Sequence, residues 1–151
     1  MTLSISPLSD ALGVEVTGID LSLPVDANHL ADIEQALNEH LVLVVRKQNF
    51  SPAQYLSAAS LFGETMEQHL SDLLMDDHPE IAVLDSRNSD VGADGCGIPL
   101  GSKDWHTDHT NHAKPPKMTS MYAIALPRGG GDTGFANMCM AYDALPDEEK
   151  T

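Results

Sequence analysis

Two residue types that bind metals stand one position apart in the stretch "WHTDHT", which begins at Trp105. In a β-strand, side chains at positions i and i+2 point to the same face. A strand here would therefore place the His106 imidazole beside the Asp108 carboxylate and turn Thr107 away. One imidazole and one carboxylate are two of the three ligands in the two-histidine, one-carboxylate sites of non-haem Fe(II) oxygenases. The spacing predicts that His106 and Asp108 share a metal ion, although a His-x-Asp triplet alone also fits a hydrogen-bonded surface pair.

The residues around this triplet have less specific interpretations. His109 and His112 continue a His-x-x-His spacing from His106. On a strand, side chains three positions apart do not point to one common site. This favours surface or pocket-lining roles for His109 and His112 over a second, zinc-like site. We expect Trp105 to pack in the core beside the metal.

The elements that must position these residues are predicted from hydrophobic periodicity and from capping residues. The first elements are strands and helices in alternation, and the later ones are mostly strands. This order favours an antiparallel sheet flanked by helices over a doubly wound parallel sheet. The segment 87–103, rich in Gly, Asp and Ser, is predicted to be a functional or disordered loop. The predicted elements are a strand within 13–22, a helix from the N-cap Asp26 to about His40, a buried strand at 41–46, a helix that starts at Ser51-Pro52 and stops at Gly63, strands at 80–86, 117–126 and 133–138, and a helix at 141–150.

Composition excludes some partners. The chain has 151 residues, 42% of them hydrophobic, which suits one domain with a core. Its net charge is −15, with only 8 Lys and Arg, which argues against nucleic acids and anionic membranes. The N-terminus lacks the basic and apolar regions of a signal peptide, and Cys96 and Cys139 form no Cys-x-x-Cys pair. We expect a cytoplasmic protein with reduced thiols.

Longer stretches resemble a known family. The sequence resembles the TauD/TfdA (taurine and 2,4-dichlorophenoxyacetate) dioxygenases in "WHTDHT" and then in "KPPKMTSMYAIALPRGGGDTGFANMCMAYDALPDEEK". It resembles that family's opening in "GVEVTGIDLS", "LVLVVRKQNFSPAQYLSAASLFGE" and "EIAVLDSRN". The resemblance implies a mixed α+β, mainly β fold: a double-stranded β-helix, or jelly roll, with flanking helices. It implies a single domain over 1–151, incomplete at its C-terminal end. It also implies Fe(II), 2-oxoglutarate as cosubstrate and O2, and hydroxylation of a small, anionic organic substrate with release of succinate and CO2.

The resemblance assigns roles to four residues. His106 and Asp108 match the first two iron ligands. Thr133, which comes after a glycine turn at 129–131, matches a threonine whose hydroxyl contacts a carboxylate of 2-oxoglutarate. A hydroxyl can donate a hydrogen bond to a carboxylate, and glycines permit a tight turn. His69 lies where family members often place a substrate-contacting residue, with an ordinary loop histidine as the alternative.

The chain lacks two of the family's functional residues. The family's second histidine ligand and its 2-oxoglutarate-binding arginine lie downstream of these motifs, whereas His112 and Arg128 are the last histidine and the last arginine here. Two ligands and water would hold Fe(II) weakly, and 2-oxoglutarate would lose a bidentate partner. We therefore expect an N-terminal portion of a longer dioxygenase, inactive alone.

Two alternatives stay open. One is a catalytically incompetent fragment or non-catalytic binding module of the same fold. The other is a different metalloenzyme, such as a hydrolase, which the absence of an H-x-H-x-D cluster and of an H-E-x-x-H helix disfavours. A reading frame that continues past Thr151 to a further histidine and arginine would favour the dioxygenase. The residues specify neither the substrate nor the oligomeric state, and a homo-oligomer of the full-length protein is left open.

Overall fold

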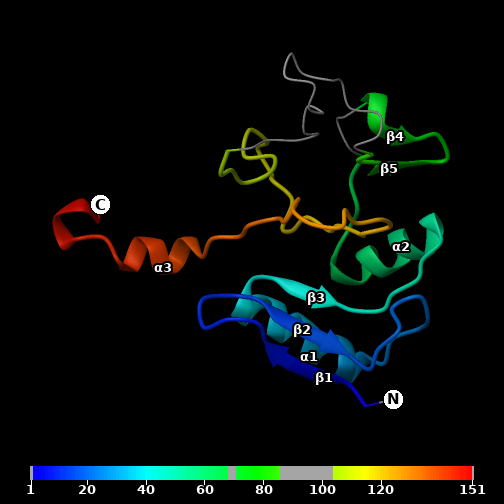
Figure 1. Cartoon of the computed structure of the whole chain (residues 1–151), viewed down its shortest axis with the longest axis horizontal. Coiled ribbons are helices and arrows are strands. Elements are labelled where there is room, and N and C mark those ends of the chain that lie inside the picture. Colours follow the sequence, from blue (N-terminus) through cyan, green and yellow to red (C-terminus); the bar gives the residue numbers. More distant parts are fainter. Residues whose placement is uncertain (1, 68–70, 86–103, 151) are drawn as a thin grey trace. The chain divides into compact units, whose positions relative to one another are not determined.

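The computed structural model describes residues 2–67, 71–85 and 104–150 (Figure 1). The chain divides into two compact units, Met1–Phe62 with Ile124–Thr151, and Gly63–Ala123. The predicted loop at 87–103, His69 and Cys96 lie outside the described residues.

The first unit contains a three-stranded mixed sheet. Strands β1 (Ser4–Pro7) and β2 (Val14–Thr17) are antiparallel, and β2 pairs in parallel with β3 (Leu43–Val45) in the order β1-β2-β3. The sheet is therefore mixed, where an antiparallel sheet was expected. Helix α1 (Ala27–His40) connects β2 to β3, and a crossover helix returns the chain in the same direction, as a parallel pair requires.

Helix α1 forms where its capping chemistry predicts. The Asp26 side chain accepts a hydrogen bond from the Asn28 N–H (2.9 Å) at the start of the helix. At its end, Leu41 takes a left-handed φ of 67°, and its N–H donates to the Leu37 carbonyl oxygen (2.8 Å). Ile33 lies on the buried face of this helix. The buried hydrophobic core of the described residues consists of Val14, Val16, Leu21, Ile33, Ala36 and Ala58.

Helix α2 (Pro52–Ala59) also begins where predicted. Ser51 and Gln54 form a reciprocal capping box, in which the Ser51 hydroxyl accepts from the Gln54 N–H (3.3 Å) and the Gln54 side chain accepts from the Ser51 N–H (2.9 Å). A short 3-10 turn, η1 (Ser60–Phe62), comes next, and the chain leaves it at Gly63, which has a φ of 150°.

The C-terminal part of the chain differs from the prediction. The stretches 117–126 and 133–138, which were predicted to be strands, contain none. Helix α3 (Met138–Asp143) starts earlier than expected because the Asn137 side chain caps it, accepting from the Met140 N–H (3.1 Å). A 3-10 turn, η4 (Asp147–Glu149), replaces the rest of the predicted helix. Asn137 also donates to the Ala11 carbonyl oxygen (2.7 Å), which joins this segment to the β1–β2 connection.

The second unit contains a 3-10 turn, η2 (Ser71–Leu73), and a hairpin of β4 (Leu74–Met75) and β5 (His78–Ala82). The strand predicted at 80–86 is confirmed only up to Ala82. The mixed α+β class is thus confirmed, but helices occupy more of the described residues than strands, so their mainly β character is not seen. The jelly roll stays a prediction. In the described ranges, no helix has the length and apolar character needed to cross a membrane.

Candidate metal site

The residues of the predicted metal site lie in the second unit, in irregular backbone. The prediction of a strand is wrong here, because residues 105–107 have no regular structure and a turn begins at Asp108. His109 in this turn has a left-handed φ of 54°. The two predicted ligands nevertheless lie together, with His106 Nε2 3.1 Å from Asp108 Oδ1.

The backbone fixes which nitrogen of His106 faces Asp108. Nδ1 lies 2.8 Å from the Asp104 carbonyl oxygen, which can only accept, so Nδ1 carries the hydrogen. Nε2 then faces the Asp108 carboxylate. The pKa of His106 is raised above its ordinary value, chiefly by the hydrogen bond to the Asp104 carbonyl, while desolvation opposes the rise and the charge of Asp108 adds to it. The surroundings of His106 therefore favour its protonated form.

The second oxygen of Asp108 has its own partner. The Thr119 hydroxyl donates to Asp108 Oδ2 at 2.8 Å. The side chains of His106 and Asp108 are 51% and 42% exposed, so solvent and small ligands can reach them. Thr119 is the residue that sequence reasoning missed, because a hydroxyl eleven positions from the carboxylate shows no spacing that would point to it.

The pair fits a metal ion in donor chemistry and in spacing. Imidazole and carboxylate are ligands of the facial triad of non-haem iron. At bonds of about 2.1 Å, the length of zinc–nitrogen and zinc–oxygen bonds, two ligands at right angles lie about 3.0 Å apart. The observed 3.1 Å between Nε2 and Oδ1 matches this separation. No group of three or more His, Cys, Asp or Glu side chains in the described part of the chain could hold a metal, so these residues offer two ligands.

Thr133 belongs to the first unit. It is exposed and comes after Gly130 and Gly131, whose φ angles of 72° and 74° lie in the left-handed region that favours glycine. The backbone of Gly131 also runs close to Pro127, whose Cγ would lie 3.2 Å from an added Cβ. The turn expected before Thr133 is present, and the contact of its hydroxyl with 2-oxoglutarate stays a prediction.

Trp105 and the other histidines have different surroundings from those expected. Trp105 is 75% exposed, so the prediction that it packs in the core is wrong. No strand among the described residues pairs with its segment to cover it. The rings of His109 and His112 meet edge to face, with centroids 5.3 Å apart, and the His112 N–H donates to the His109 carbonyl oxygen (3.0 Å).

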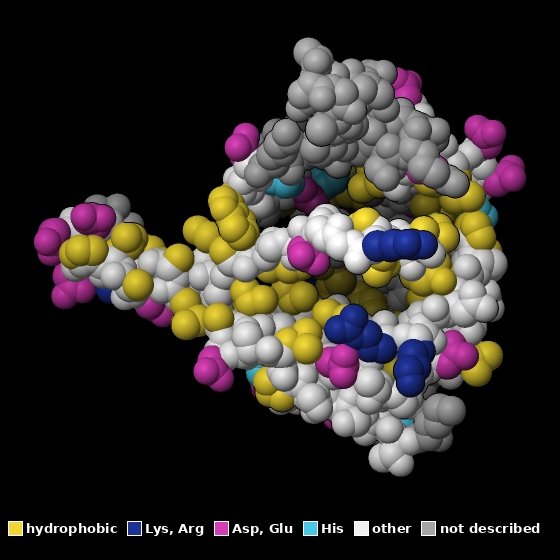
Figure 2. Space-filling model, in the orientation of Figure 1, with side chains coloured by type: hydrophobic (Ala, Val, Ile, Leu, Met, Phe, Trp, Pro, Cys, Tyr) yellow, Lys and Arg dark blue, Asp and Glu magenta, His cyan; other side chains and the backbone are white. Residues whose placement is uncertain are grey.

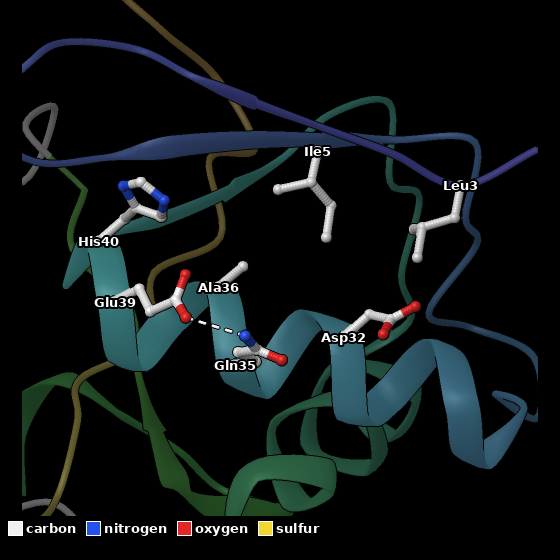
Figure 3. A pocket seen from close by; sticks show the side chains of 7 residues that line it. All are labelled: Leu3, Ile5, Asp32, Gln35, Ala36, Glu39 and His40. Carbon is white, nitrogen blue, oxygen red and sulfur yellow. Dashed lines mark hydrogen bonds between the residues drawn. The ribbon is translucent and has the colours of Figure 1, made fainter.

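A shallow groove of about 340 Å³ lies between β1 and α1 in the first unit (Figure 3). None of the predicted site residues lines it. The Gln35 side chain donates to the Glu39 carboxylate (2.8 Å), one turn further along α1. No three metal-binding side chains lie together among the described residues, so the groove offers no alternative metal site. Its lining residues are Leu3, Ile5, Asp32, Gln35, Ala36, Glu39 and His40.

One histidine and one carboxylate are two of the three ligands of the non-haem iron facial triad. The family model described as "Taurine catabolism dioxygenase TauD, TfdA family" matches residues 4–151, and the chain belongs to that family. The resemblance predicted from the sequence motifs is thereby confirmed.

Three curated relatives illustrate the family's range. Pentalenolactone F synthase of Streptomyces avermitilis is 34% identical over 91% of this chain and 46% of its own length. The alpha-ketoglutarate-dependent sulfate ester dioxygenase of Pseudomonas putida is 30% identical over 97% of the chain and 46% of the relative. An alkylsulfatase of Acinetobacter baylyi is 33% identical over 96% of the chain and 43% of the relative. The chain thus spans about half the length of these relatives.

Among solved structures, a taurine dioxygenase from Burkholderia xenovorans is 31% identical, covering 51% of this chain and 27% of that structure, with a TM-score of 0.45. At this score the match does not define the fold.

Proposed function

We propose that this chain forms the metal-binding part of an Fe(II)- and 2-oxoglutarate-dependent dioxygenase that hydroxylates a small, anionic organic substrate and releases succinate and CO2. The observation that carries the proposal is the 3.1 Å separation of His106 Nε2 and Asp108 Oδ1, which suits two adjacent ligands of one ion. Membership of a dioxygenase family supports it. The jelly roll is the fold that we propose for the complete protein.

Iron and 2-oxoglutarate supply the oxidative chemistry when they are bound, and the protein supplies geometry and charge. His106 would hold the iron ion through Nε2, because Nδ1 is hydrogen-bonded to the Asp104 carbonyl oxygen. Asp108 binds through Oδ1 and contributes one negative charge against a divalent ion. Both side chains are half exposed, so cosubstrate, substrate and oxygen could reach a metal ion that they would hold.

The Thr133 hydroxyl is proposed to donate a hydrogen bond to one carboxylate of 2-oxoglutarate. Removing one hydrogen bond to a charged group costs about 1.5–3 kcal/mol. Thr133→Ala should therefore raise the half-saturating concentration of 2-oxoglutarate by about 10- to 150-fold. His69 is proposed to contact the substrate.

The printed names of the relatives suggest the class of substrate. The Pseudomonas putida relative acts on sulfate esters, and a relative from Sphingobium herbicidovorans, 33% identical over 97% of this chain and 49% of its own length, acts on (S)-phenoxypropionate. Both substrates join an organic body to an anionic group. We propose the same general class, a small organic anion, for this protein.

The test is succinate formation by the complete gene product with Fe(II), 2-oxoglutarate, oxygen and a panel of sulfonates, sulfate esters and aryloxy acids. Asp108→Ala should abolish turnover because it removes the negatively charged ligand. Thr107→Ala removes a neighbouring hydroxyl that makes no hydrogen bond within the described residues and is the matched control, with turnover retained.

Full activity of Asp108→Ala, or turnover without 2-oxoglutarate, would refute the proposal. A complete gene product that binds Fe(II) and forms no succinate with any substrate of the panel would favour the non-catalytic binding module.

A further inference from the structure

The two oxygens of the Asp108 carboxylate face different partners. Oδ1 lies 3.1 Å from His106 Nε2, on the side where a metal would sit. Oδ2 accepts the Thr119 hydroxyl at 2.8 Å. An ionised carboxylate has about four lone-pair sites on its two oxygens, so binding one donor at Oδ2 leaves Oδ1 open to a metal.

The terminal torsion of an aspartate side chain has no sharp preference of its own. It is broad and roughly two-fold, so the two oxygens of a free carboxylate exchange places easily. A threonine is stiff at χ1 because its Cβ is branched, and a hydrogen bond to a carboxylate is strengthened by the charge. Thr119 can therefore hold the Asp108 carboxylate in one orientation.

This hydrogen bond also connects two segments that no strand pairing joins in the described residues. Asp108 opens the turn that contains His109, which has a left-handed φ of 54°. Thr119 lies eleven positions further on, in irregular backbone. The orientation of the ligand carboxylate thus depends on a contact from a separate stretch of the same unit.

We propose that Thr119 is a positioning residue that sets Asp108 to bind the metal through Oδ1 alone. The inference rests on the proposed function, because it assumes that Asp108 is a metal ligand. Thr119 acts through Asp108 and does not itself touch the metal.

The experiment measures Mn(II) affinity of the complete gene product by the loss of the free-ion electron paramagnetic resonance signal. Partners that orient a metal ligand typically contribute about 10- to 100-fold in metal affinity. Because Thr119 is exposed, we expect Thr119→Val to weaken Mn(II) binding by about tenfold, at the lower end of that range. Thr119→Ser keeps the hydroxyl and should restore affinity to within about threefold of the unchanged protein, a smaller loss than that expected for removing an orienting partner. Thr107→Val, which deletes a hydroxyl with no partner among the described residues, should bind as the unchanged protein does.

The visible absorption of bound Co(II) gives a second measurement that a merely structural role would not change. If Thr119→Val lets both oxygens of Asp108 bind, the added ligand should shift the Co(II) bands and lower their intensity. Thr119→Ser should keep the original spectrum.

The outcomes separate the two proposals. Failure of the unchanged protein to bind Mn(II), or equal binding by Asp108→Ala, refutes the metal site itself. Loss of binding in Asp108→Ala together with full affinity and an unchanged Co(II) spectrum in Thr119→Val overturns the role of Thr119 alone. An equal loss in Thr119→Ser and Thr119→Val also overturns it, since the hydroxyl would then not be responsible.

Discussion

Replacing Ile33 with alanine tests how α1 is held in the first unit. Ile33 is fully buried and is one of the three largest fully buried side chains in the described residues, with Val14 and Val16 of β2. The core around them contains only a small number of apolar side chains, so each contributes a large share of the stability. The unit's parallel strand pair depends on α1, because the helix connects β2 to β3.

The expected loss can be worked out from the atoms removed. Ile33→Ala deletes three carbons, and at about 0.8 kcal/mol for each buried methylene the transfer term alone is about 2.4 kcal/mol. A cavity term adds to this, which places the total within the roughly 2–5 kcal/mol typical of such substitutions. Ile33→Val removes one carbon and should cost about 0.8 kcal/mol.

Amide hydrogen exchange measures these losses without requiring the whole chain to unfold at once. The amides of α1 should exchange at least about 50-fold faster in Ile33→Ala, the factor for the transfer term alone, and about fourfold faster in Ile33→Val, since about 1.4 kcal/mol is a factor of ten. Leu23→Ala is the control, because Leu23 is 60% exposed and its truncation should change exchange little. Equal acceleration in Ile33→Ala and Leu23→Ala would refute the packing of α1 through Ile33.

Two further predictions concern the cap of α2 and the exposed apolar surface. Ser51→Ala breaks the capping box and should cost about 1 kcal/mol, so the amides of α2 should exchange about fivefold faster, whereas Ser51→Thr should change them little. Ile124 and Leu126 are 83% and 79% exposed, and hydrophobic side chains lie at the surface along the segment that carries α3 (Figure 2). The chain alone should therefore associate as its concentration rises, as measured by light scattering, and Ile124→Lys with Leu126→Lys should reduce this. A monomer that unfolds in one sharp transition would contradict the second prediction.

The features that the sequence predicted well are those that a few neighbouring residues determine. Asp26 begins α1 and Ser51 begins α2 because each cap needs only its own side chain and an N–H two or three residues on. The apolar spacing that includes Ile33 fixes which face of α1 is buried. Such information is local and can be obtained from one sequence.

The strands predicted at 117–126 and 133–138 show the opposite case. Their apolar and β-branched residues favour strands, but β propensity largely reflects packing against neighbouring strands. The described residues supply no pairing partner for either stretch. The same dependence explains Trp105, which was predicted to be buried and is exposed, since none of the described strands pairs with its segment.

The His106–Asp108 pair was predicted from a strand that does not exist, and the two side chains nevertheless lie together. Residues two positions apart can be brought together by more than one backbone conformation, so their proximity does not require a strand. The Asp104 carbonyl and the turn at His109 orient the two side chains instead. Histidine is among the residues enriched in left-handed backbone, but nothing in its identity indicates where the chain goes next. The hydrogen bond from Thr119 depends on that path, which is why the proximity of His106 and Asp108 was predictable from the sequence and the contact from Thr119 was not.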